Sequence, residues 1–130
     1  MARNTRTYSD FDLNFMKNPV TLDIGMKYDE NAVKASIKNL VLTRNYERPF
    51  HSEIGTQIGS LLFNPAGPML DIMLKRSITD VINTFEPRAV LLDVQVLSKL
   101  DSNAVDITIT FRVINKPNPV TLSLILKRTR

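Results

Sequence analysis

The C-terminal third of the chain has the clearest pattern, an alternation of apolar and polar residues. Between residues 105 and 113 the apolar positions are Val105, Ile107, Ile109, Phe111 and Val113. A period of two is typical of a β-strand that buries one face. The same alternation at 90–97 and 120–127, with turn-forming residues at 99–103 and 115–118, predicts a three-stranded antiparallel meander. In its first strand, we expect one face to carry Val90, Leu92, Val94 and Val96.

A helical period precedes the meander. The apolar positions of this segment are Leu70, Leu74, Ile78, Val81 and Phe85. Their spacing of three to four residues predicts a helix from Pro68 to about Phe85. Proline suits the first position of a helix, and the residue before Pro87 disfavours helix, so both ends are marked.

Two further helices are expected earlier in the chain. The first begins after Asp29, which we interpret as its N-cap, and carries the apolar stripe Val33, Ile37, Leu40 and Val41. Residues 43–53 interrupt the pattern, and Pro49 prevents a helix there. A short second helix is predicted over about 54–63.

The N-terminal region contains a pentapeptide that returns near the C-terminus. Asn-Pro-Val-Thr-Leu occurs at 18–22 and again at 118–122. Because turn residues precede a β-branched run in both copies, we expect each copy to begin a strand. Residues 20–24 then form an extra N-terminal strand.

The predicted organisation is therefore one α+β domain over residues 9–127. Two or three helices pack on the C-terminal three-stranded antiparallel meander, with the extra N-terminal strand beside them. Residues 1–8 are predicted to be a flexible basic tail, and residues 128–130 a second basic tail.

Composition excludes several kinds of chemistry. The 130 residues include no Cys and one His, which rules out disulfides, thiolate catalysis and a multi-histidine metal site within one chain. We expect no cofactor and no metal. No apolar run reaches the roughly 20 residues that span a bilayer, and the first fifteen residues lack the apolar segment of a signal peptide. A membrane is thus not an expected partner.

The net charge of +4 comes from the chain ends. The terminal cations are Arg3, Arg6, Lys127, Arg128 and Arg130. Without these five of the 17 Lys and Arg residues, 12 bases face 13 acids, so the remaining chain is close to neutral. A neutral domain with basic ends suits acidic protein neighbours better than nucleic acid, which is not an expected partner.

Enzymatic signatures are scarce. The sequence has no P-loop, dinucleotide fingerprint, nucleophile elbow or zinc-protease motif. Paired carboxylates remain the alternative, as in a lysozyme-like peptidoglycan hydrolase that would use Glu47, Glu53 or Glu86. Glu47 and Glu86 each have an arginine within two residues, and a guanidinium favours the charged carboxylate, whereas a general acid must be protonated.

Two polar segments are candidates for contact with a partner. The first spans residues 43–55 and includes Arg48, Pro49, Phe50 and Glu53. It is either a structured loop with Phe50 in the core and Arg48 paired to Glu53, or a contact surface. The second, the triplet at 86–88, holds an arginine fork beside a proline that restricts the backbone. The fork either binds carboxylates or is solvated.

The order of these segments resembles a known family. Thr-Arg-x-x-x-Arg-Pro-Phe-x-x-Glu-x-Gly at 43–55, Leu-Leu-Phe at 61–63, Glu-Pro-Arg at 86–88 and the meander resemble the baseplate wedge family of contractile phage tails, which type VI secretion systems share. The resemblance covers about residues 8–127. It implies a structural protein of the virion tail baseplate, assembled in the host cytoplasm, that is not an enzyme and that initiates polymerisation of the tail sheath.

The resemblance also implies roles for individual residues. Glu86, Pro87 and Arg88 match the family triplet that docks on the helical core bundle of the wedge. Arg48, Pro49, Phe50 and Glu53 match the block that supports the structure or contacts a partner. The strand that would pair with an arm of the sheath protein consists of Val120, Thr121, Leu122, Ser123, Leu124, Ile125 and Leu126. The implied partners are other wedge proteins, the sheath protein, and tube or hub proteins.

Overall fold

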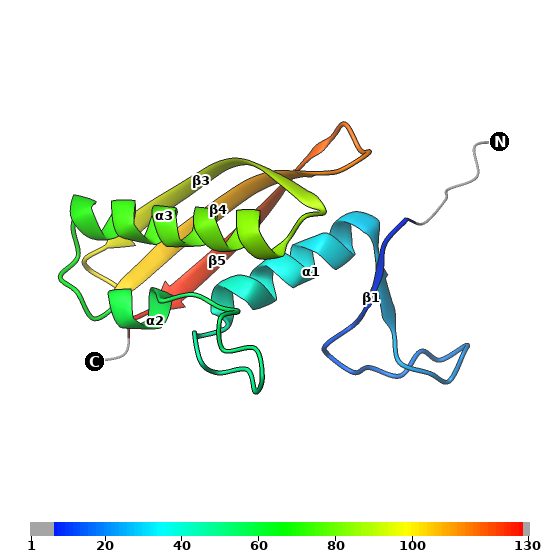
Figure 1. The fold of residues 1–130 in the computed structure, drawn as a ribbon. Coiled ribbons are helices and arrows are strands. Elements are labelled where there is room, and N and C mark those ends of the chain that lie inside the picture. Colours follow the sequence, from blue (N-terminus) through cyan, green and yellow to red (C-terminus); the bar gives the residue numbers. More distant parts are fainter. Residues whose placement is uncertain (1–6, 129–130) are drawn as a thin grey trace.

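The chain forms two layers, a three-stranded antiparallel sheet and the helices that cover one of its faces (Figure 1). The computed structural model describes residues 7–128. The helices are α1 (Asp29–Leu42), α2 (Ile58–Leu61) and α3 (Pro68–Phe85). The sheet has the order β3 (Ala89–Lys99), β4 (Ala104–Val113), β5 (Pro119–Lys127), and a separate hairpin pairs β1 (Ser9–Phe11) with β2 (Met26–Tyr28). The predicted α+β class and the meander are confirmed.

Helix α3 begins and ends where the sequence predicts. Pro68 occupies its first turn, and the helix ends at Phe85, immediately before Glu86. It lies along β3 (Figure 1), and the Ser98 hydroxyl donates a hydrogen bond to Asp71 from across this contact. The apolar stripe faces the sheet, whereas Lys75, Arg76 and Asp80 are exposed.

The core lies between the helices and the central strand. Phe111 of β4 is its largest fully buried side chain, and Ile107 and Ile109 share its face of the sheet. Opposite them, α3 contributes Leu70, Leu74, Ile78 and Ile82, and α1 contributes Val33, Ile37 and Val41. Burying a side chain of this size stabilises the fold by roughly 1.5–3 kcal/mol. The packing fixes the position of both helices relative to the sheet.

Strand β3 departs from its predicted alternation. The pairing register with β4 shifts between Leu91 and Asp93, so one extra residue is accommodated as a β-bulge. Val94 is buried, whereas Val90 and Leu92 are exposed, and the prediction that all three share one face is wrong. The bulge changes which face each residue occupies, and alternation alone does not reveal it.

Helix α1 is present as predicted, but Asp29 does not cap it. The N-cap position belongs to Tyr28, and Asp29 is the first helical residue. The Asp29 Oδ1 atom instead accepts hydrogen bonds from the backbone N–H groups of Thr7, at 2.8 Å, and Tyr8, at 3.1 Å. Oδ2 lies 3.3 Å from Lys116 Nζ. This carboxylate holds the N-terminal segment to the domain.

The predicted second helix is shorter than expected. Only Ile58–Leu61 is helical, because residues 54–56 run beside the loop that follows α1. The Thr56 N–H donates to the Thr43 carbonyl at 2.8 Å, and Gly55 has a φ of 141°. A Cβ on Gly55 would lie 2.7 Å from the Arg44 carbonyl, so glycine is required for this close approach.

The N-terminal region contains strands, but the placement of the extra strand at residues 20–24 is wrong. Residues 19–21 form a turn, in which the Asn18 side-chain oxygen accepts the Val20 N–H at 2.9 Å. Leu22 has a φ of 58°, outside the β region. The extended segments of this region are β1 and β2, on either side of this turn. The second copy of the pentapeptide does begin a strand, β5.

The domain extends beyond its predicted boundaries at both ends. Thr7 and Tyr8 are bonded to Asp29, and Tyr8 also packs against the core. At the other end, Arg128 Nε donates to the Leu62 carbonyl at 2.8 Å. Both ends of 7–128 are therefore part of the fold, while the rest of the predicted tails, 1–6 and 129–130, lies outside the described residues. No helix within 7–128 is long and apolar enough to cross a bilayer.

Candidate docking surface

The triplet at 86–88 lies where the chain passes from α3 to β3. Glu86 is only 3% exposed, and its N–H donates to the Ile82 carbonyl at 3.0 Å. Its carboxylate receives a hydrogen bond from the Ser36 hydroxyl of α1. Pro87 is exposed at the corner itself. The acidic member of the predicted docking triplet thus points into the protein.

Arg88 binds this carboxylate through two hydrogen bonds. Its Nε atom donates to Oε1 at 2.7 Å, and Nη2 donates to Oε2 at 3.1 Å. The same guanidinium reaches Asp10 Oδ2 at 3.3 Å and lies 5.7 Å from the centre of the Tyr8 ring. A cation at this distance from an aromatic face is attracted to it. We call Arg88, Glu86, Ser36, Asp10 and Tyr8 the Arg88 cluster.

The electrostatics of this cluster favour charged side chains. Burial raises the pKa of Glu86, but the hydrogen bonds from Arg88 and Ser36 outweigh that effect, so the net pKa is below its ordinary value. The hydrogen bond to Glu86 raises the pKa of Arg88 above its ordinary value, although partial burial opposes this. Both groups are ionised at neutral pH, and the pair joins α1, the α3–β3 corner and the N-terminal hairpin.

The loop between α1 and α2 presents its predicted residues to solvent. Phe50 is fully exposed, and its φ of 66° lies in the left-handed region. Arg48 is also exposed, and Glu53 pairs with His51, at 3.3 Å, instead of with Arg48. The interpretation in which Phe50 enters the core and Arg48 pairs with Glu53 is wrong. The alternative, a contact surface, fits the observed exposure.

A groove lies beside the start of the α1–α2 loop and next to residues that contact the triplet. It has a volume of about 870 Å³ and lies between the β1–β2 hairpin, α1 and the start of the α1–α2 loop. Asp10 and Ser36 of the Arg88 cluster line one part of it, and Arg48 and Pro49 line another. Its apolar lining comes from Phe11, Leu13, Met26, Ala35, Leu40 and Leu42. We call it the hairpin groove.

Three members of the Arg88 cluster are absent from the sequence-based candidates. Asp10 and Arg88 are 78 residues apart, and Ser36 is 50 residues from Glu86. Tyr8 falls within the predicted tail. No local pattern marks these residues, because their roles depend on which segments the fold brings together.

Both outer strands of the sheet lack a neighbouring strand within residues 7–128. In β5, Leu122 and Leu124 are buried, and Val120 and Leu126 are half-buried on the same face. Thr121, Ser123 and Ile125 point to the other, exposed face. The hairpin strands form their own sheet and do not pair with β5, although α1 packs nearby.

Comparison with known proteins assigns the chain to a family. The model of the family described as baseplate wedge protein gp25 matches residues 27–118. The chain belongs to this family. The baseplate wedge protein gp25 of Enterobacteria phage T4 is 29% identical over 120 residues, which cover 92% of this chain and 90% of the phage protein. The predicted family is thereby confirmed.

Solved structures share the fold of this baseplate wedge protein. A chain in the baseplate of the anti-feeding prophage has a TM-score of 0.65 and 17% identity, with 95% of this chain and 87% of that chain covered. A crystal structure from Geobacter sulfurreducens that carries the name tail lysozyme has a TM-score of 0.70 and 19% identity, covering 75% and 89%. At this level of identity, the likeness concerns the fold.

Proposed function

We propose that this baseplate wedge protein is a structural, non-catalytic tail subunit that joins other wedge proteins and initiates the tail sheath. The observation that carries the proposal is the outer edge of β5, which has no neighbouring strand among the described residues. Backbone N–H and C=O groups along an unpaired strand can bind an added strand. We infer that an arm of the tail sheath protein adds to β5.

The two edges of the sheet differ in how well they could accept a strand. β3 contains a bulge at 91–93, and its Asp93 forms an ion pair with Lys75 at 3.7 Å. Bulges and charges are features that protect an edge from pairing. β5 has an uninterrupted register with β4, and residues 119–126 carry no charge. These features favour addition at β5.

The hairpin groove is the proposed docking site for the helical core bundle of the wedge. An apolar groove with polar residues at its rim suits an amphipathic helix. Arg48 and Pro49 line an exposed side of this site, and the exposed Phe50 follows them in the loop, which supports a role in partner contact over a purely structural one. The triplet at 86–88 supports docking indirectly, since Arg88 and Glu86 maintain the arrangement of the hairpin and α1. Pro87 remains available at the surface.

Two of the carboxylates named for the hydrolase alternative, Glu53 and Glu86, are poorly suited to acid catalysis. A glycosidase requires a general acid whose pKa is raised. The pKa of Glu86 is lowered by Arg88 and Ser36 against the effect of burial, and the pKa of Glu53 is lowered by hydrogen bonds to its own N–H and to His51. Neither group is suited to donate a proton at neutral pH. Neither Glu53 nor Glu86 therefore qualifies as the general acid of a lysozyme-like hydrolase.

Strand addition is tested with the sheath protein of the same tail. A proline placed in the middle of the sheath arm removes a backbone donor, and we expect it to abolish sheath growth on wedges that contain this chain. The matched control is a proline in the arm outside the paired segment, which should leave growth unchanged. Equal growth with both arms would refute the role of β5.

Docking is tested by reconstituting the wedge. We expect Arg48→Glu to reduce incorporation of this chain into the wedge, because it reverses a charge at the rim of the hairpin groove. Arg76→Glu, an exposed arginine on α3 outside this groove, is the control. Circular dichroism should confirm that both variants are folded. Full incorporation of Arg48→Glu would argue that the groove faces away from the partner.

A further inference from the structure

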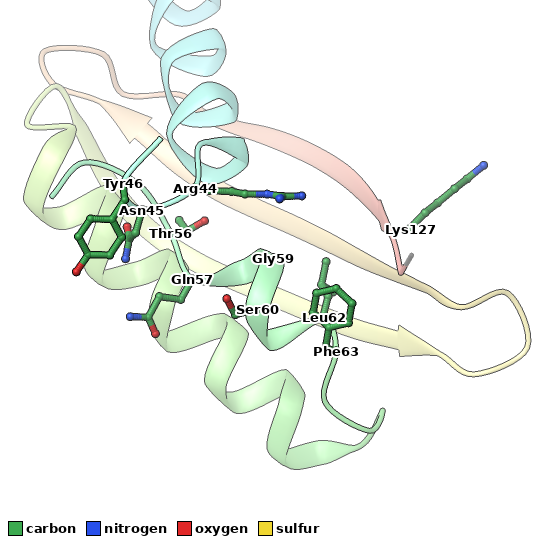
Figure 2. Close-up of a pocket in the computed structure, with 10 residues that line it drawn as sticks. All are labelled: Arg44, Asn45, Tyr46, Thr56, Gln57, Gly59, Ser60, Leu62, Phe63 and Lys127. Carbon is green, nitrogen blue, oxygen red and sulfur yellow. The ribbon is translucent and has the colours of Figure 1, made fainter. Parts of the chain in front are cut away.

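A second pocket lies at the C-terminal end of β5, between α2 and the loop that follows α1 (Figure 2). Its volume is about 380 Å³. Arg44 and Lys127 both line it, and its lining includes no acidic residue. Figure 2 shows the Arg44 side chain extending toward the side on which Lys127 lies, with Leu62 and Phe63 on the wall formed by the end of α2. The pocket thus combines positive charge with apolar surface.

The two cations are available to a ligand. Within residues 7–128, neither Arg44 nor Lys127 forms an ion pair. The nearby Glu47 carboxylate accepts the backbone N–H of Arg44 at 2.8 Å. Gly59 leaves room for the arginine, since a Cβ there would lie 3.3 Å from Arg44 Nε. The arginine therefore lies against α2 with no acidic partner.

Asn45 lines the same pocket and carries an unpaired acceptor. The Asn45 Oδ1 atom is buried and has no hydrogen-bond partner within the described part of the chain. Because this atom is closed to the pocket, the character of the occupant follows from Arg44 and Lys127. Two cations without an acidic partner suit a carboxylate. An acidic side chain on a peptide strand brings a carboxylate to the end of β5.

We propose that this pocket binds an acidic side chain of the strand that adds to β5. The inference rests on the proposed function, because it needs a strand at that edge. Lys127 is the last residue of β5, so the end of an added strand arrives beside the pocket. There the carboxylate lies between Arg44 and Lys127. The pocket selects the arm and sets its register.

The test is a double-mutant cycle between this chain and a labelled sheath-arm peptide. Each acidic residue of the peptide is changed in turn to its amide. We expect one of these changes to lower affinity about tenfold or more, as does the Arg44→Gln, Lys127→Gln variant of the chain. The two changes combined should cost no more than either alone. Arg112→Gln, an exposed arginine on β4 outside the pocket, is the matched control.

The outcomes separate the pocket from strand addition itself. If the arm binds equally well to the wild-type chain and to the Arg44→Gln, Lys127→Gln variant, the pocket assignment is overturned and strand addition stands. If no arm binds the wild-type chain, strand addition fails and the pocket assignment falls with it. Single-stranded DNA that binds the wild-type chain more tightly than the arm, and not the variant, would also overturn the assignment.

Discussion

Arg88 holds the carboxylate of Glu86 through a two-point hydrogen-bonded contact, with Nε 2.7 Å from Oε1 and Nη2 3.1 Å from Oε2. The carboxylate is buried, whereas the arginine side chain is 25% exposed and continues to Asp10. A pair of this kind makes the surrounding segments depend on one another. Its removal should therefore affect the whole domain as well as its docking.

Arg88→Ala is expected to lower the free energy of unfolding by about 3 kcal/mol. The substitution leaves the Glu86 carboxylate buried without its cation, which costs more than the net contribution of the pair. Arg88→Lys should recover only part of the loss, because an ammonium group lacks the planar two-point geometry. Urea denaturation measures the effect. The exposed Arg112→Ala serves as the control and should change stability by less than about 0.5 kcal/mol; equal shifts would contradict the prediction.

Stability should decline in acid because of Glu86. The pKa of Glu86 is lowered in the folded state from an ordinary value near 4.5. Between the folded pKa and the ordinary pKa, the unfolded chain therefore binds more protons than the folded chain. The stabilisation is complete above about pH 4.5 and is lost as the pH falls through the folded value. Glu86→Gln should flatten the dependence measured by urea denaturation between about pH 3 and 7.

A residual slope is expected even in Glu86→Gln. The pKa of Asp29 is also lowered, by hydrogen bonds from the Thr7 and Tyr8 backbone and the contact with Lys116. Glu53 contributes in the same direction through its own N–H and His51. An unchanged acid dependence in Glu86→Gln would show that Glu86 has no part in it.

Gly55→Ala should be destabilising, and Gly67→Ala should be close to neutral. Gly55 has a φ of 141°, and a Cβ there would lie 2.7 Å from the Arg44 carbonyl group. The clash and the backbone strain should cost roughly 1–3 kcal/mol. Gly67 has extended backbone, and a Cβ added there would have no atom within 4 Å. Thermal unfolding of both variants checks the difference, and similar melting temperatures would argue against the close approach.

Phe50→Ser should separate docking from folding. Phe50 is fully exposed, so its removal should change stability by less than about 0.5 kcal/mol. If the α1–α2 loop contacts another wedge protein, loss of an aromatic anchor should weaken binding about tenfold or more. The affinity is measured by titrating each variant with the other wedge proteins of the reconstituted wedge. Leu100→Ser, 75% exposed in the β3–β4 turn, is the control and should bind like the wild type. Identical binding by Phe50→Ser would remove the loop from the interface.

The fold was predictable where strong periodicity and clear end signals agree. Helix α3, with Pro68 at its start and Pro87 beyond its end, matches its prediction, as do the three strands of the meander in their approximate bounds. In these segments each local preference supports the same structure, and burial of the apolar face against the core reinforces it.

The candidate site was predictable only in part. The sequence marks the triplet at 86–88 and the block at 48–53; of these, Arg48 and Pro49 line the hairpin groove, whereas the triplet only contacts two residues that line it, Asp10 and Ser36. The sequence does not mark Asp10, Ser36 or Tyr8, because their contacts with the triplet join segments far apart in the chain. Hydrogen bonds of that kind arise from packing, for which a linear pattern holds no signal.

The two copies of Asn-Pro-Val-Thr-Leu show that local sequence does not determine local structure by itself. The same five residues form a turn at 18–22 and the start of a strand at 118–122. At the second site, Leu122 is buried opposite Ile109 of β4, and the neighbouring strand satisfies the backbone. At the first, Leu22 is exposed and no such strand is present among residues 7–128. Local preference allowed both conformations, and the tertiary contacts available to each copy selected between them, because strand pairing and burial outweigh the small energy differences encoded in five residues.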